Sequence, residues 1–73
     1  MTTQALPTLL NGEAITLEAS VQLPALLQAH NIDPLQVGIA VAVNRKLVPR
    51  AKWDETQVKP GDAVEVVHAR QGG

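Results

Sequence analysis

The residues best suited to take part in a reaction are the last two, Gly72 and Gly73, which would place a terminal carboxylate beyond the rest of the chain. Glycine has no Cβ, so a Gly-Gly segment can enter a narrow channel and adopt backbone angles closed to other residues. We interpret the pair as a reactive end, carried by Arg70 and Gln71, whose working group is the carboxylate of Gly73. Chain termini are also commonly loose for no functional reason, so the other residues must support this interpretation.

The composition excludes most other chemistry. The chain has no cysteine, which rules out disulfides, thiolate metal ligands and a cysteine nucleophile. Its two histidines, His30 and His68, are far apart and lack metal-ligand spacing, so we expect no metal site. Lys and Arg together number 6 against 7 Asp and Glu, a balance that argues against binding to nucleic acid or an anionic membrane. No pair of residues forms a catalytic constellation, so we expect a protein that is not an enzyme.

The chain is short enough for a single small domain. Its start lacks the basic residues and apolar run of a signal peptide, and no apolar run is long enough to span a bilayer. Trp53 is the only aromatic residue, too few for base stacking on single-stranded nucleic acid. We therefore expect a soluble cytoplasmic protein with a loose arm at residues 1–7, a domain at residues 8–69 and a flexible tail at residues 70–73.

The first half of the domain predicts a hairpin followed by a helix. Asn11-Gly12 lies between apolar runs at residues 8–10 and 14–17, which is typical of a hairpin with a type I′ turn. Residues 18–22 are expected to be a connection. A helix should begin near Leu23, with Pro24 in its first turn, and stop at Asn31. Helical spacing gives it a buried face, formed by Leu23, Leu26, Leu27 and the partly buried His30.

The second half predicts further strands. Residues 38–43 alternate, so that Ile39, Val41 and Val43 face the core while Ala40 and Ala42 face the other way. We expect a turn at residues 44–46, a short strand at 47–48, an irregular crossing at 50–56 anchored by Trp53, and a turn at 59–62. The last strand runs from residue 63 to about residue 69. Its core residues are Val64 and Val66, and its other face carries Glu65 and Val67.

This order of elements predicts an α+β fold in which a mixed sheet of four to five strands packs on one main helix. If the first and last strands are central neighbours, as in a β-grasp, the last strand carries the tail away from the end of the sheet. The sheet face turned away from the helix then becomes a candidate partner-docking surface, formed by Ala40, Ala42, Glu65 and Val67 and bordered by Arg70. An ordinary half-exposed sheet face accounts for the same residues equally well.

Several segments also resemble a known family. Ala42-Val43-Asn44, Val48-Pro49-Arg50 with Trp53, Gly61-Asp62-Ala63-Val64-Glu65-Val66 and the terminal Gly72-Gly73 are similar in order and spacing to the ThiS family, sulfur carrier proteins of thiamine biosynthesis. The resemblance covers about residues 8 to 73. Two features depart from it. The arm at residues 1–6 is longer than usual and is followed by Pro7 and Thr8 where an apolar strand start is expected, and His30 stands at a position that is usually aliphatic.

The resemblance implies a ubiquitin-like β-grasp fold, no catalytic activity and no cofactor bound by the carrier itself. A partner adenylyltransferase would activate the Gly73 carboxylate with ATP, and a sulfur-donor system would convert it to a thiocarboxylate. Thiazole synthase would then accept the sulfur. One alternative is the small subunit of molybdopterin synthase or another β-grasp sulfur carrier, although these are usually longer and richer in aromatic residues. Another is a non-covalent β-grasp interaction module in which the Gly-Gly pair is incidental.

Overall fold

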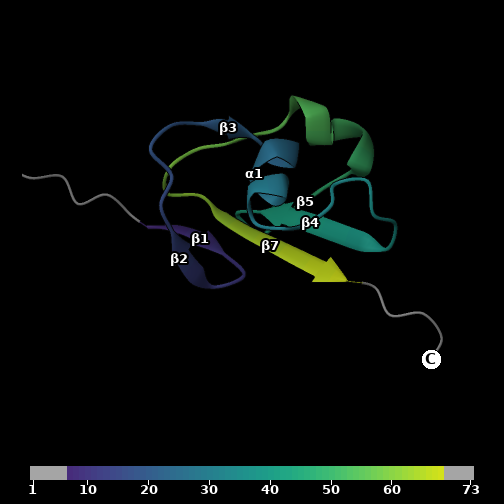
Figure 1. Ribbon diagram of the computed structural model, residues 1–73, viewed down its shortest axis with the longest axis horizontal. Coiled ribbons are helices and arrows are strands. Elements are labelled where there is room, and N and C mark those ends of the chain that lie inside the picture. The colour runs from purple at the N-terminus through teal and green to yellow at the C-terminus, as the bar shows by residue number, and fades with distance from the viewer. Residues whose placement is uncertain (1–6, 69–73) are drawn as a thin grey trace, which may run out of the picture.

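The computed structural model describes residues 7–68 and begins with a β-hairpin of β1 (Thr8–Leu10) and β2 (Glu13–Ile15) (Figure 1). Its turn residues, Asn11 and Gly12, have φ values of 53° and 85°, the positive pair that a type I′ turn requires. The predicted hairpin is therefore confirmed, although β2 starts one residue earlier than expected and ends two residues earlier.

The main helix, α1 (Leu23–Ala29), begins where the sequence predicts, with Pro24 in its first turn. Proline costs little there because the first N–H groups of a helix have no partner within it. The residues that the helix buries are Leu23, Leu26 and Leu27.

The helix ends through a left-handed residue, as predicted. Asn31 has a φ of 65°, and the N–H of Ile32 donates to the carbonyl of Leu27 at 2.8 Å. His30 is half-buried beside them. The short polar side chain of Asn31 tolerates the left-handed conformation, and the reversal lets Ile32 pack back against the core.

Five strands form one mixed sheet in the order β2-β1-β7-β4-β5. The remaining three are β4 (Ile39–Val43), β5 (Lys46–Val48) and β7 (Ala63–His68). β1 and β7 run parallel at the centre, and the other neighbours are antiparallel. One helix packed on a sheet with this order is a ubiquitin-like β-grasp, so the predicted fold class and the central pairing of first and last strands are confirmed.

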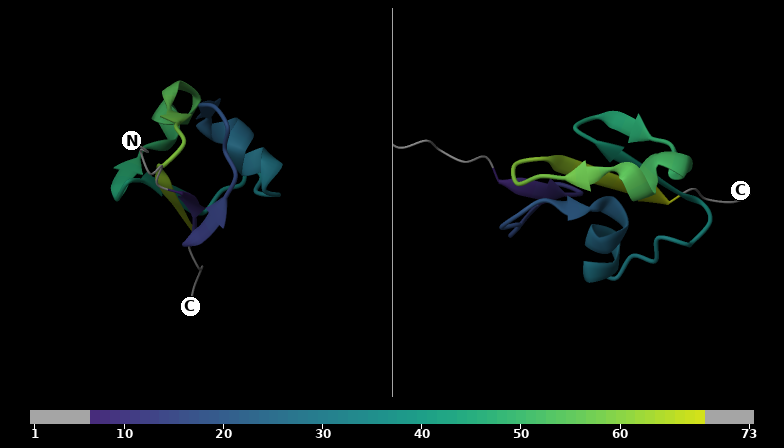
Figure 2. Two further views of the ribbon diagram at one scale, coloured as in Figure 1. Left: turned by 90° about the vertical axis from the view of Figure 1, so that its left-hand side faces the viewer. Right: turned by 90° about the horizontal axis from the view of Figure 1, so that it is seen from above.

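The core lies between α1 and one face of the sheet (Figure 2). The largest fully buried side chains come from the helix, from β4 and β7, and from the segment before the last turn: Leu23, Leu27, Val41, Val58 and Val64. The predicted inward residues of the long strands are thus confirmed. Within residues 7–68, no helix is long and apolar enough to cross a membrane.

Two parts of the structure differ from the prediction. The expected connection before the helix contains β3 (Val21–Gln22), which pairs with β6 (Gln57–Val58) in a second, two-stranded sheet. The expected irregular crossing is a 3-10 helix, η1 (Arg50–Glu55). Trp53 is buried in it and its indole N–H donates to the carbonyl of Val48 at 2.9 Å, which confirms its role as the anchor of this segment.

The two remaining turns have the expected chemistry. Asn44 and Arg45, with φ values of 52° and 70°, connect β4 to β5, so this turn is one residue shorter than predicted. In the turn before β7, Gly61 has a φ of 97° and the N–H of Asp62 donates to the carbonyl of Lys59 at 3.0 Å. The N–H of Gly61 also donates to the hydroxyl of Thr8 at 2.8 Å, which explains how a polar residue is buried at the start of β1.

Candidate functional site

The predicted reactive end, which comprises Arg70, Gln71, Gly72 and Gly73, lies outside the described residues, as do the arm residues 1–6 and Ala69. The structure does place the strand from which the end continues. β7 is the central strand of the sheet, and its last residue, His68, pairs with Ile39 at the start of β4. The chain therefore leaves the described body from the end of the sheet where β4 begins (Figure 1).

The four predicted docking residues lie together on the face of the sheet that α1 does not cover. Ala40 pairs directly with Val67, and Ala42 pairs directly with Glu65. Directly paired residues share a face, with Cβ atoms about 4.5–5.5 Å apart. Val67 is 61% exposed, Ala40 and Glu65 are exposed, and Ala42 is half-buried. The period-two prediction of these residues is thus confirmed in position, while their role in docking stays a prediction.

The structure extends this surface to a residue that the sequence analysis did not select. Leu47 of β5 pairs with Ala42 and is 70% exposed. The sequence signal for Leu47 was period-two alternation, which places it on the opposite face of the strand from Val48, a residue that is half-buried in the structure. We call the surface formed by Ala40, Ala42, Leu47, Glu65 and Val67 the open face.

The shape and charge of the open face suit contact with another protein. Its two alanines leave a shallow floor, because a methyl group barely rises above the backbone. Leu47 and Val67 stand at either side of this floor, on the strands that flank β4. Glu65 contributes its single charge. Exposed apolar side chains that gather in one place, rather than singly, mark surfaces that bind partners.

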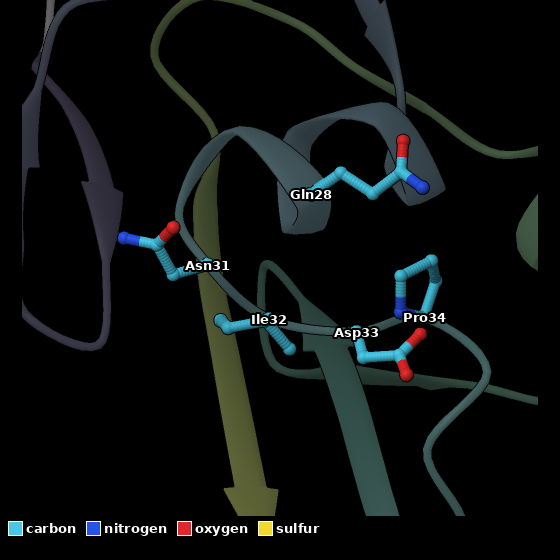
Figure 3. A pocket seen from close by; sticks show the side chains of 5 residues that line it. All are labelled: Gln28, Asn31, Ile32, Asp33 and Pro34. Atoms are coloured by element: carbon cyan, nitrogen blue, oxygen red, sulfur yellow. The ribbon is translucent and has the colours of Figure 1, made fainter.

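A hollow with a volume of about 330 Å³ lies at the end of α1 (Figure 3). Its lining residues are Gln28, Asn31, Ile32, Asp33 and Pro34. Asn31 and Asp33 extend in opposite directions (Figure 3). The Asp33 carboxylate accepts the N–H of Leu35 at 2.9 Å and so stabilises a local turn.

Among residues 7–68, no group of three or more His, Cys, Asp or Glu side chains is placed to hold a metal ion. The same residues leave no buried side-chain nitrogen or oxygen without a hydrogen-bond partner. Buried polar atoms without partners are the usual mark of a missing ligand or a catalytic group. Within the described residues, the candidate functional features are therefore the open face and β7, the strand that leads to the chain end.

Comparison with known proteins gives consistent relationships. The model of the ThiS family matches residues 8–73. The chain is 32% identical over 65 residues to the sulfur carrier protein ThiS of Escherichia coli (strain K12), a match that covers 89% of this chain and 96% of that protein.

Two solved structures are similar across nearly the whole chain. The crystal structure of the thiamine biosynthesis protein ThiS from Geobacter metallireducens superposes with a TM-score of 0.77 at 31% identity, over 93% of this chain and 100% of that one. A solution structure of a thiamine biosynthesis protein from the same organism gives a TM-score of 0.70 at 30% identity, over 93% and 88% of the two chains.

Proposed function

The chain belongs to the ThiS family, the sulfur carriers of thiamine biosynthesis, and on that premise we propose that the carboxylate of Gly73 is its working group. A carboxylate resists attack because its negative charge is delocalised over two oxygens. A partner adenylyltransferase removes this obstacle by joining the carboxylate to the AMP part of ATP, with release of pyrophosphate. The acyl carbon of Gly73 then carries a good leaving group.

Sulfur enters in the second step. A sulfide-level sulfur nucleophile delivered by the sulfur-donor system attacks the acyl carbon, the new C–S bond replaces the bond to AMP, and AMP leaves with its electron pair, which gives a thiocarboxylate at Gly73. Splitting one difficult substitution into an adenylyl transfer and an acyl transfer lowers the barrier of each. Thiazole synthase accepts the sulfur, which the thiocarboxylate presents as a portable nucleophile.

The chain acts in this scheme as a carrier and not as an enzyme. ATP binds to the adenylyltransferase, so the carrier needs no cofactor of its own. We place the carrier and its partners in the cytoplasm.

The observation that carries the proposal is that the open face includes β7, the strand that continues toward Gly73. Fixing a residue of the chain end in a channel costs about 1–2 kcal/mol in backbone entropy. A body that docks beside the channel offsets this cost. Ala40, Ala42, Glu65 and Val67 are the residues that we propose for this docking contact.

The direct test is the intact mass of the carrier after incubation with its adenylyltransferase, ATP and a sulfur source. We expect the mass increase that follows replacement of one oxygen by sulfur. A variant that lacks Gly73 and a variant with residues added after Gly73 should both fold and stay unmodified. Modification of either variant to the wild-type extent would show that Gly73 is not the working group, and a wild-type chain that gains no mass would favour the non-covalent module, in which the Gly-Gly pair is incidental.

Transfer to the acceptor separates the thiamine pathway from the other carrier pathways. The thiocarboxylated chain should give up its sulfur to thiazole synthase and should not serve the large subunit of molybdopterin synthase. The opposite preference would identify the chain as a molybdopterin-synthase small subunit.

A further inference from the structure

A second exposed apolar pair lies in the loop between α1 and β4. Leu35 and Val37 are 83% and 85% exposed, the highest values among the large apolar residues that the structure describes. They are separated only by Gln36 and neither belongs to the open face, because the loop precedes β4. Large apolar side chains that stay in water at this level and this close together need an explanation other than packing.

The loop that presents them is held in one conformation by Arg50. Its guanidinium donates to the carbonyls of Pro34 and Gln36, at 2.6 Å each, from either side of Leu35. The same guanidinium lies 4.2 Å from the centroid of the Trp53 ring, whose indole is buried. The planar fork of an arginine is suited to two such bonds at once, so the loop is connected to the core through Arg50.

A preformed loop gives an exposed apolar pair a binding advantage. Ordering of loops and side chains is one of the main costs of association, and a surface that is already ordered avoids it. The N–H of Gln36 also donates to the carbonyl of Asp33 at 3.0 Å, which adds a turn at the start of the loop. Leu35 and Val37 are therefore presented to solvent on an ordered backbone.

The position of this pair relates it to the chain end. Ile39 pairs with His68, and paired Cα atoms lie about 5 Å apart. Val37 is two residues before Ile39, so its Cα lies within about 12 Å of that of His68. Five residues connect His68 to Gly73, a reach of at most about 18 Å. The loop lies at the end of the body where β7 ends (Figures 1 and 2).

We infer that Leu35 and Val37 form a contact patch for the adenylating enzyme that takes up Gly73. The inference rests on the proposed function, because an enzyme that holds the Gly73 carboxylate has to approach within reach of His68, where this loop lies. The patch borders a hollow of about 190 Å³ with room for an apolar side chain of the enzyme. The hollow is lined by Pro24, Pro34, Leu35, Arg50, Trp53 and Asp54.

The loop patch and the open face then contact the enzyme from two sides of the same end. The open face lies on the uncovered side of the sheet, whereas Leu35 and Trp53 line the same hollow on the side of η1 and α1. An apolar side chain of the enzyme that enters this hollow would be a hot spot of the contact. We assign the main contact to Leu35, which lines the hollow, and a supporting role to Val37.

The test is the rate of thiocarboxylate formation as a function of carrier concentration, measured by intact mass. For the double variant Leu35→Ser/Val37→Ser we expect the half-saturating carrier concentration to rise about tenfold or more, the loss that truncating a hot spot gives. The maximal rate should change by less than about twofold, because the chain end and its chemistry are untouched. Gln36→Ser, in the same loop, is the matched control and should behave as wild type.

A second variant, Arg50→Ala, tests the loop patch without changing its two apolar side chains. Arg50→Ala leaves both apolar side chains in place and releases the carbonyls of Pro34 and Gln36, so it should also raise the half-saturating concentration. All variants should keep the wild-type midpoint of thermal unfolding, apart from Arg50→Ala, for which a lower midpoint is acceptable. If the double variant itself proves unstable, the single variants Leu35→Ser and Val37→Ser replace it.

The outcomes separate the inference from the proposed function. A wild-type carrier that forms no thiocarboxylate contradicts the proposed function. A wild-type carrier that is converted, beside a folded double variant with the same half-saturating concentration, overturns the loop patch alone. A defect confined to sulfur transfer to thiazole synthase also overturns it, since the patch would then serve the acceptor and not the adenylating enzyme.

Discussion

At the scale of single residues, Trp53 connects three parts of the described body: η1, the end of β5 and Arg50. It fills the space between η1 and the core, its indole N–H bonds the end of β5 through Val48, and its ring supports the guanidinium of Arg50. An aromatic ring with a polar edge suits a position where one side is apolar and the other meets a carbonyl.

Two substitutions of Trp53 separate its packing from its hydrogen bond. Trp53→Phe keeps most of the apolar ring but leaves the Val48 carbonyl without its donor, which should cost about 1–2 kcal/mol. Trp53→Ala removes the ring and should cost about 3–5 kcal/mol, enough to unfold much of a domain of this size. Urea unfolding followed by circular dichroism measures both. Equal losses in the two variants would contradict the assignment of most of the stabilisation to the ring.

Asn11 also has two separable roles. Its φ of 53° belongs to the hairpin turn, and its side-chain oxygen accepts the N–H of Val66 at 2.7 Å, which connects the turn to β7. Both roles depend on one short amide side chain, because few other residues combine left-handed tolerance with an acceptor.

Asn11→Gly should keep the turn and lose only the hydrogen bond, at a cost of about 1 kcal/mol. Asn11→Ala should lose the bond and also carry the left-handed strain of a Cβ, about 1–2 kcal/mol more. Thermal and urea unfolding of the two variants give the difference. If the alanine variant is as stable as the glycine variant, the strain argument is wrong.

At the scale of elements, the sequence predicts those that local chemistry defines. The Asn11-Gly12 pair, Pro24 at the helix start and Asn31 at its end each require a particular backbone conformation, and the structure shows each one. The alternation along β4 and β7 likewise determines which residues face α1.

The elements that the sequence did not predict depend on distant contacts. β3 and β6 have two residues each, too few to show an alternating pattern, and they pair across more than thirty residues of chain. The 3-10 conformation of η1 is short and lacks a periodic signal of its own. Its position depends on the burial of Trp53, which is a property of the folded core.

The candidate site also contains some residues that the sequence predicts and others that depend on distant contacts. Ala40, Ala42, Glu65 and Val67 follow from period-two alternation within two strands, so the sequence was sufficient to group them. Leu47 lies on β5, which has only three residues, so alternation gives a weaker signal there. The loop patch was missed because its order depends on Arg50, which lies 14 and 16 residues beyond the two carbonyls that it binds.

The open face is tested by Val67→Arg. Because Val67 is 61% exposed, the free energy of unfolding should change by no more than about 0.5 kcal/mol. The half-saturating carrier concentration for adenylation should rise about tenfold, since an arginine prevents close approach to the alanine floor. Ala14→Arg is the control, because Ala14 is exposed on β2 and pairs with Leu9, which pairs in turn with Ala63, so Ala14 lies at the far end of the same sheet face from Val67.

The result for Val67→Arg is read against Ala14→Arg under identical conditions. An increase in the half-saturating concentration for Val67→Arg alone supports docking through the open face. Equal behaviour of the two variants would show that the face is an ordinary half-exposed sheet surface.

At the scale of the whole molecule, the described residues form a body whose functional surfaces gather at one end. β7 ends there, β4 begins there, and the loop that carries Leu35 and Val37 leads into β4. The helix, the hairpin and Trp53 contribute to the core that stabilises this end. The proposed chemistry takes place on Gly73, and the body supplies the contacts by which an enzyme receives it.

The proposed modification of Gly73 is tested most directly by the mass of the C-terminal peptide of the carrier after treatment with its adenylyltransferase, ATP and a sulfur source. The account predicts a peptide ending in Gly73 in which one carboxylate oxygen is replaced by sulfur, formed only when ATP is present. An unmodified C-terminal peptide under conditions that convert another ThiS protein, or sulfur found on a different residue, would contradict it.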